Sequence, residues 1–183
     1  LLEVACETDF VARTDAFQKL GERRARIGGR EVVIAGLCKG AGMICPNMAT
    51  MLAFFLTDAD IKAPLLSEAL KIAVNASFNS IIVDNDTSTN DTVLAFANGM
   101  SGASEIKAGT KEFREFTALL TSLSVELAQM IVRDGEGATR LVEIEVKGAF
   151  SPQDARSAVR TIAESFLCKT AFFGGDPNWG RVM

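Results

Sequence analysis

The chain has 183 residues, of which 48% are hydrophobic and 23% are charged, and its formal net charge is −4. This composition is typical of a folded globular chain of one domain, and the acidic balance argues against nucleic acid as a partner. No apolar run reaches the roughly 18 residues of a membrane span, and the first ten residues carry acids where a signal peptide has Lys or Arg. We therefore expect a cytoplasmic protein without a membrane segment.

Histidine and tyrosine are absent from the sequence. The lack of histidine excludes Ser-His-Asp and Cys-His catalysis and the usual zinc ligand sets, and we expect neither a metal nor a cofactor. The cysteines are widely spaced without a CxxC pair, which is typical of buried thiols in a reducing cytoplasm; they are Cys6, Cys38, Cys45 and Cys168. A nucleophile in this chain needs another base, and the α-amine of a terminal Thr or Ser, with a pKa of about 8, is one candidate.

Two adjacent glycines, Gly28 and Gly29, interrupt the pattern near the beginning of the chain. Before them, residues 14–26 have the spacing of a helix. The balance of acidic and basic residues also changes at this point, from slightly basic to clearly acidic. We therefore predict a separate amino-terminal segment, residues 1–29, and a core of residues 30–183.

The core alternates between strand-like and helix-like segments. Period-2 or β-branched patterns predict strands at residues 31–37, 51–56, 81–83 and 141–146, with a further apolar segment at 92–97. Helices are predicted at residues 67–79, at 110–133 with Thr110 as the N-cap, and after Ser151-Pro152. The helix at 110–133 is the clearest, because its apolar residues keep to one stripe. The mixture predicts a layered α+β fold with sheets sandwiched between helices.

The segment before and after Thr50 is the strongest candidate for chemistry. A small residue, Ala49, precedes Thr50, between a Pro46-Asn47 turn and a buried strand. If the backbone there is strained, the Thr50 hydroxyl could attack the preceding carbonyl and free a Thr amino terminus. The alternative is that Thr50 only begins the strand, and spacing by itself favours this alternative.

Four motifs occur in order along the core: KGAGMICPNMATMLAFFLTDA at residues 39–59, FNSIIVDNDTSTNDT at 78–92, VRDGEGATR at 132–140 and KTAFFGGDPNWGR at 169–181. Together they closely resemble the ornithine acetyltransferase family of glutamate N-acetyltransferases, some of which are bifunctional. The resemblance covers residues 30–183 and does not include the beginning or the end of the family pattern. It implies the α/β/β/α sandwich of these self-cleaving enzymes.

The resemblance implies a function in arginine biosynthesis. The chain would cut itself between Ala49 and Thr50, and Thr50 would then carry acetyl from N-acetylornithine to glutamate. Lys39 would bind the substrate through its carboxylate or the amide under attack, and Glu136 would bind the cationic amine. Alternatively, Lys39 is a solvated turn lysine and Glu136 a loop carboxylate at a helix end. Some family members also accept acetyl-CoA, and the two fragments form a heterotetramer.

The polar residues of the second and fourth motifs have less specific interpretations. Residues 84–91 carry many short hydrogen-bonding side chains, which favours a structural role near the site. Trp179 is expected in the core rather than at a ligand. In the family, a Thr-Gly pair upstream of the cleavage position supplies the oxyanion donors. These 183 residues do not match that part of the pattern, so we expect them to transfer acetyl poorly or not at all on their own.

The first residues have a resemblance of their own. LLEVACETDFVARTDAFQ, residues 1–18, is similar to a segment of elongation factor Ts in which Thr8, Asp9, Phe10 and Val11 would engage elongation factor Tu. The alternative function is therefore a fragment that binds elongation factor Tu. Self-cleavage belongs only to the enzyme and separates the two interpretations.

Overall fold

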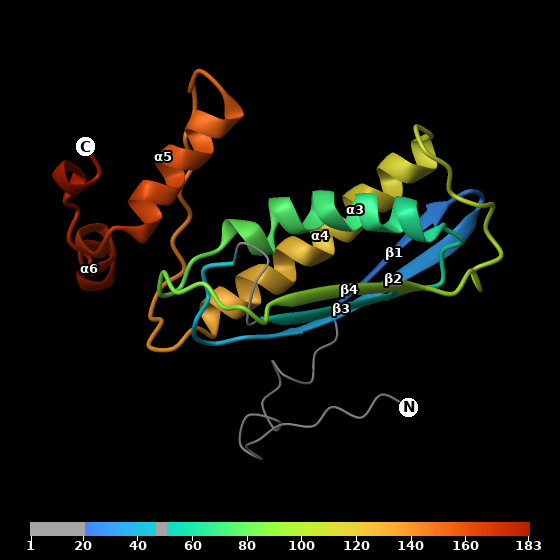
Figure 1. Ribbon diagram of the computed structural model, residues 1–183, viewed down its shortest axis with the longest axis horizontal. Helices are drawn as coiled ribbons and strands as arrows, with labels where there is room; N and C mark the ends of the chain where they lie inside the picture. The colour runs from blue at the N-terminus through green and yellow to red at the C-terminus, as the bar shows by residue number, and fades with distance from the viewer. Residues whose placement is uncertain (1–20, 47–50) are drawn as a thin grey trace, which may run out of the picture. The chain divides into compact units, whose positions relative to one another are not determined.

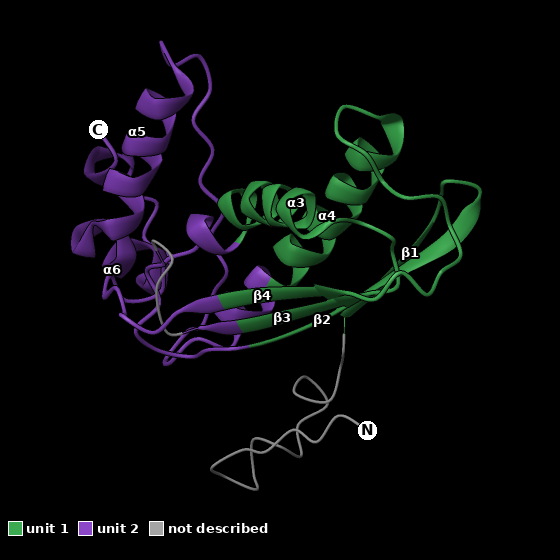
Figure 2. Ribbon diagram, turned by 45° about the vertical axis from the view of Figure 1, so that its right-hand side comes forward, with its two compact units in different colours: residues 1–38, 53–77, 93–127 green, residues 39–52, 78–92, 128–183 purple. Residues whose placement is uncertain are grey.

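The computed structural model describes residues 21–46 and 51–183. By their contacts, these residues form two compact units that interleave along the chain (Figure 2). Among the described residues, the first unit contains residues 21–38, 53–77 and 93–127, and the second contains residues 39–46, 51–52, 78–92 and 128–183. The predicted division into residues 1–29 and 30–183 stays a prediction, since most of the shorter part lies outside the described residues.

A four-stranded sheet forms the frame of the first unit, in the order β1-β2-β3-β4. Its strands are β1 (Gly21–Ile27), β2 (Arg30–Lys39), β3 (Leu52–Thr57) and β4 (Thr92–Ala97). β1 and β2 form an antiparallel hairpin, and its turn consists of Gly28 and Gly29, both at positive φ. The strands predicted at residues 31–37 and 51–56 are confirmed, and the apolar segment at 92–97 is a strand as well.

The helix predicted for residues 14–26 is wrong in its described part, because Gly21–Ile27 is a strand. Its side chains alternate between partly buried and exposed, which is the period of a strand. Gly21 lies opposite Gly36 of β2, and both glycines pack against the helix that covers the sheet. A Cβ at Gly21 would lie 2.6 Å from Leu123, and one at Gly36 would lie 2.9 Å from Leu127. The pair of glycines thus lets the helix approach the sheet closely.

Two helices, α3 (Ala63–Ala76) and α4 (Lys111–Arg133), lie on one face of the sheet (Figure 1). The core between them and the strands is apolar, with Val32, Ile34 and Phe55 from the sheet and Leu120 and Leu123 from α4 all buried. The helix predicted at residues 110–133 is confirmed together with its cap. The Phe113 amide donates to the Thr110 hydroxyl at 3.2 Å, as an N-cap requires.

α4 is long and apolar enough to cross a membrane by length and composition. Its apolar stripe, however, is already buried in the protein at Phe113, Phe116, Leu120 and Leu127. A membrane-spanning helix would present such residues to lipid instead. α4 is therefore accounted for as a core helix.

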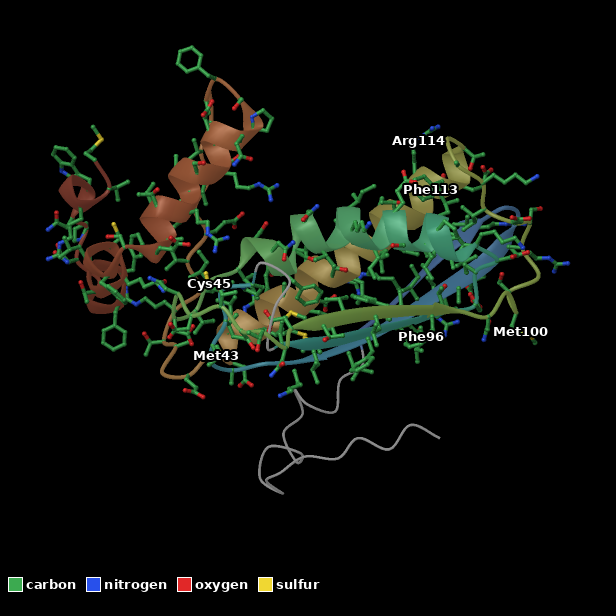
Figure 3. The ribbon with its side chains drawn as sticks, viewed as in Figure 1. Met43, Cys45, Phe96, Met100, Phe113 and Arg114 are labelled. Carbon is green, nitrogen blue, oxygen red and sulfur yellow. The ribbon has the colours of Figure 1, made fainter. Side chains whose placement is uncertain are left out.

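The other face of the sheet carries exposed apolar side chains. Phe96 is 53% exposed and points away from α3 and α4 (Figure 3), and Leu56 and Leu94 are also exposed.

The predicted α+β fold is confirmed, and the described residues hold one sheet of the predicted sandwich. The strand predicted at residues 141–146 is wrong, because Leu141 and Val142 are exposed in irregular chain and no described strand pairs with them.

The second unit ends in two helices, α5 (Pro152–Glu164) and α6 (Phe166–Gly174). α5 begins as predicted, with the Ser151 hydroxyl accepting from the Asp154 amide at 3.1 Å. None of its residues is fully buried, so its predicted inner face is only partly covered. Residues 81–83, predicted as a strand, are irregular chain after a short 3-10 turn, Phe78–Ser80.

The buried stripe of α4 predicts a specific loss of stability. Replacing Leu120, which is 1% exposed, by Ala should lower the free energy of unfolding by about 2–5 kcal/mol, because the cavity cannot close fully. The neighbouring Leu119 is only partly buried, and Leu119→Ala is the matched control with a smaller loss. Urea unfolding followed by circular dichroism measures both. Equal losses in the two variants would contradict the assigned face of the helix.

Candidate active site

The chain that leaves β2 leads to the predicted cleavage position. Ala49 and Thr50 lie outside the described residues, and Pro46 and Met51 are the nearest described positions on either side. Both of these flanking residues are buried. Gly40 packs against the downstream side, since a Cβ there would lie 3.3 Å from the Met51 Cβ.

Asp84 holds the upstream side of this position. Its carboxylate accepts hydrogen bonds from the backbone amides of Met43 and Ile44 and from the Asp86 amide at 3.1 Å. Met43 has a positive φ of 56°, which is uncommon for a residue with a side chain. Hydrogen bonds to an ionised acceptor are stronger than neutral ones, so Asp84 can stabilise this turn.

Cys45 lies in a polar cluster of the second unit (Figure 3). Its carbonyl accepts from the Thr87 hydroxyl at 2.9 Å, and its sulfur lies 3.0 Å from an Arg160 guanidinium nitrogen. Arg160 also forms an ion pair with Glu164 at 2.6 Å, and the Asn85 side-chain Nδ2 donates to the Glu164 backbone carbonyl at 2.6 Å. The loop of residues 84–91 and α5 thus hold the same short segment of chain.

Lys169 adds a partly buried cation to this cluster. Its ammonium donates to the Val83 carbonyl at 2.8 Å. Burial lowers the pKa of Lys169, and the charges of Asp84, Cys45 and Glu164 oppose this shift. Lys169 therefore ties α6 to the beginning of the loop that contains Asp84.

Asp91 holds the downstream side. Its Oδ1 accepts from the Met51 amide, and the Met51 carbonyl accepts from the Thr92 amide at 2.9 Å. Burial raises the pKa of Asp91, while the hydrogen bond from Met51 opposes that shift. Its other oxygen, Oδ2, is buried and has no hydrogen-bond partner among the described residues.

The two predicted substrate residues are both exposed and lie in the second unit. Lys39 is the last residue of β2. The Glu136 amide donates to the carbonyl of Ala41 at 2.8 Å, two residues after Lys39. The Glu136 carboxylate lies against Gly42, where an added Cβ would be only 2.9–3.1 Å from its atoms. The roles of Lys39 and Glu136 in binding stay predictions.

Comparison with known proteins gives this geometry a context. A sequence model of the ArgJ family matches residues 7–183. The chain belongs to the ArgJ family. The "Arginine biosynthesis bifunctional protein ArgJ" of Listeria monocytogenes strain EGD-e is 50% identical over 175 residues, covering 96% of this chain and 44% of that protein. The mitochondrial ArgJ protein of Candida albicans strain WO-1 is 49% identical, covering 98% of this chain and 42% of that protein.

The fold agrees with this family. The crystal structure of an ArgJ protein from Bacillus halodurans matches with a TM-score of 0.70 and 44% identity, covering 73% of this chain and 62% of that one. The chain spans less than half the length of the ArgJ relatives named above. The family predicted from the four motifs is confirmed.

The resemblance of residues 1–18 to elongation factor Ts is not borne out. The ArgJ family match already includes residue 7, and the relatives align with nearly the whole chain. A short similarity over 18 residues cannot outweigh a continuous match of this length. Thr8, Asp9, Phe10 and Val11 lie outside the described residues, and nothing found supports binding to elongation factor Tu.

Two residues that contact the chain near the predicted cleavage position were not identified from the sequence. Arg160 and Lys169 contact segments far away in the chain, although Lys169 opens the fourth motif.

Trp179, expected in the core, is 76% exposed. Cys38, Cys45 and Cys168 are free thiols, and no group of three His, Cys, Asp or Glu side chains that could hold a metal occurs in the described part of the chain.

The contacts of Asp84 predict its contribution to this region. Asp84→Ala should lower the free energy of unfolding by about 1.5–3 kcal/mol, because three amides lose a charged acceptor. Hydrogen exchange measured by mass spectrometry should show faster exchange at Met43 and Ile44. Asp86→Ala is the control, since Asp86 is exposed and belongs to the same loop. Unchanged exchange in the Asp84 variant would show that the carboxylate does not hold this turn.

Proposed function

We propose that this chain carries the self-cleaving nucleophile of a glutamate N-acetyltransferase of arginine biosynthesis. The observation that carries the proposal is the ArgJ family match over residues 7–183, which includes the PNMAT segment and all four motifs. The arrangement of loop 84–91 on both sides of Thr50 supports a backbone held for reaction.

In the proposed self-cleavage, the Thr50 hydroxyl adds to the Ala49 carbonyl carbon. The new ester bond forms as the Ala49-Thr50 peptide bond breaks, and the hydroxyl proton passes to the departing Thr50 nitrogen. Water then hydrolyses the ester, which leaves a carboxylate on Ala49 and a free α-amine on Thr50. Because the chain contains no histidine, this amine is the proposed base for the later steps.

In the proposed transfer, the freed Thr50 hydroxyl attacks the acetyl carbonyl of N-acetylornithine. Ornithine leaves with the proton, and the acetyl group remains on Thr50 as an ester. The amine of glutamate then attacks this ester and carries the acetyl group away. Lys39 and Glu136 have opposite charges and suit the two ends of a zwitterionic amino acid.

Further properties of the ArgJ relatives extend the proposal. The word bifunctional in their names supports acetyl-CoA as a second acetyl donor and the chain as part of a multifunctional enzyme. The two fragments would remain associated as a heterotetramer. We propose the cytoplasm as the compartment, as for a bacterial protein, although the Candida relative is named mitochondrial.

Self-cleavage is the first test. Incubation of the purified chain should yield fragments of residues 1–49 and 50–183, and Thr50→Ala should remain whole because it lacks the attacking hydroxyl. Intact-mass spectrometry measures both. Thr89→Ala, at an exposed threonine of the neighbouring loop, should cleave like the unsubstituted chain. Only full-length protein after long incubation would contradict the proposed cleavage in this chain.

Substrate charge is the second test. Glu136→Gln should weaken the binding of N-acetylornithine by about 10- to 100-fold, because a charged hydrogen bond contributes roughly 1.5–3 kcal/mol. Isothermal titration calorimetry measures the dissociation constant. Glu143→Gln is the matched control at another exposed carboxylate and should bind normally. Equal affinity in both variants would remove Glu136 from the substrate site.

A further inference from the structure

The chain after β2 and the chain after α4 lie against each other at Gly42 and Glu136, which both belong to the second unit. The Glu136 amide donates to the Ala41 carbonyl at 2.8 Å. The Glu136 side chain lies against Gly42, where an added Cβ would be 2.9 Å from the carboxyl carbon and 3.0 and 3.1 Å from the two oxygens. These distances leave no room for a side chain at residue 42, so the carboxylate can lie there only because that residue is a glycine.

The backbone conformation of Gly42 does not itself require a glycine. Gly28 and Gly137 have a positive φ, which side chains rarely allow, but Gly42 does not. An alanine could therefore adopt the conformation of Gly42 without backbone strain. The three atoms nearest to an added Cβ all belong to Glu136, so the contact with this carboxylate is what explains the glycine.

The backbone on either side of Gly42 is held in place. The Ala41 carbonyl accepts from the Glu136 amide, and the Asp84 carboxylate accepts from the amides of residues 43 and 44. A methyl group added at residue 42 could not be accommodated by a shift of this backbone without the loss of these hydrogen bonds.

The backbone before Glu136 is held as well. Gly135 is buried, and an added Cβ there would lie 3.1 Å from a methyl carbon of Val83. The Gly135 carbonyl accepts from the Ala138 amide at 2.9 Å. Because both backbones are held, a side chain at residue 42 would displace the flexible part of the contact, which is the Glu136 carboxylate.

The Glu136 carboxylate is available to a ligand. Residue 136 is exposed, and in the described part of the chain its carboxylate takes part in no ion pair and accepts no hydrogen bond. An ionised carboxylate only accepts hydrogen bonds, and its strongest ones come from a cationic donor such as an ammonium group. A side chain that already lies against the backbone also loses less conformational freedom when it binds.

We propose that Gly42 is a positioning residue for substrate binding, which leaves room for the Glu136 carboxylate at the place where this carboxylate binds the cationic amine of N-acetylornithine. This inference rests on the proposed function. It adds an uncharged residue to Lys39 and Glu136, and this residue acts through Glu136 without touching the substrate itself.

The test measures the dissociation constant of N-acetylornithine by isothermal titration calorimetry. Gly42→Ala should weaken binding by about fivefold or more, because the displaced carboxylate no longer reaches the ammonium at hydrogen-bond distance. Gly174→Ala is the matched control, since an added Cβ there meets no atom within 4 Å and Gly174 has no positive φ. This control should bind like the unsubstituted chain.

Two further measurements separate positioning from a general disturbance of the fold. In a Glu136→Ala background, adding Gly42→Ala should change the dissociation constant by less than about twofold, because the carboxylate that the methyl group displaces is gone. N-acetylnorvaline has the carbon chain of N-acetylornithine without the ammonium group. Its affinity should be the same in Gly42→Ala and in the unsubstituted chain.

The NMR resonance of the Glu136 carboxyl carbon gives a readout without ligand. Its absence from the spectrum of Glu136→Gln assigns it. The resonance should shift in Gly42→Ala, because the carboxylate moves, and should stay unchanged in Gly174→Ala. An unshifted resonance in Gly42→Ala would overturn the inference whatever the binding data show.

The outcomes distinguish this inference from the proposed function. If the unsubstituted chain does not bind N-acetylornithine, the proposed substrate is overturned, and the role of Gly42 with it. If Glu136→Ala weakens binding and Gly42→Ala does not, only the role of Gly42 is overturned. Unchanged binding in Glu136→Ala removes both residues from the site. Equal losses from Gly42→Ala with and without the Glu136 carboxylate would also overturn its role, since the methyl group would then act elsewhere.

Discussion

Backbone amides that leave a sheet must find acceptors elsewhere, and this requirement organises the second unit. After β2 the chain no longer has a neighbouring strand, and the amides of Met43 and Ile44 are satisfied by Asp84. Just before β3, the Met51 amide is satisfied by Asp91. Because these acceptors belong to one loop, the described residues on either side of the predicted nucleophile are held by side chains rather than by regular structure.

Local sequence patterns predicted the elements in which the buried side chains recur at one regular spacing. β2 and α4 were identified because their apolar residues recur every second residue or every three to four residues. β1 was missed because its charged side chains resemble an exposed helix, and it is a strand only through its pairing with β2. Residues 141–146 show the reverse case, in which a strand-like alternation pairs with none of the strands in the described part of the chain.

The candidate site was predictable where it depends on motifs and unpredictable where it depends on distant contacts. Thr50, Lys39 and Glu136 were identified from the resemblance of the four motifs to a known family. The contacts of Arg160 with Cys45 and of Lys169 with Val83 join residues far apart in the chain. No periodicity or spacing in the sequence encodes such pairs, because they arise from the way the chain returns to itself.

The close packing of α4 on the hairpin has a consequence for how this sequence can vary. Gly21 and Gly36 face each other across the strands, and the side chains of Leu123 and Leu127 fill the space where a methyl group would otherwise fit. The space between the strand and the helix is therefore divided between the side chain of the strand residue and the side chain of the helix residue. A larger residue in the strand can be accommodated only with a smaller one in the helix. In homologous sequences, the side-chain volumes at the strand and helix positions should therefore vary in opposite directions, and their sum should stay nearly constant.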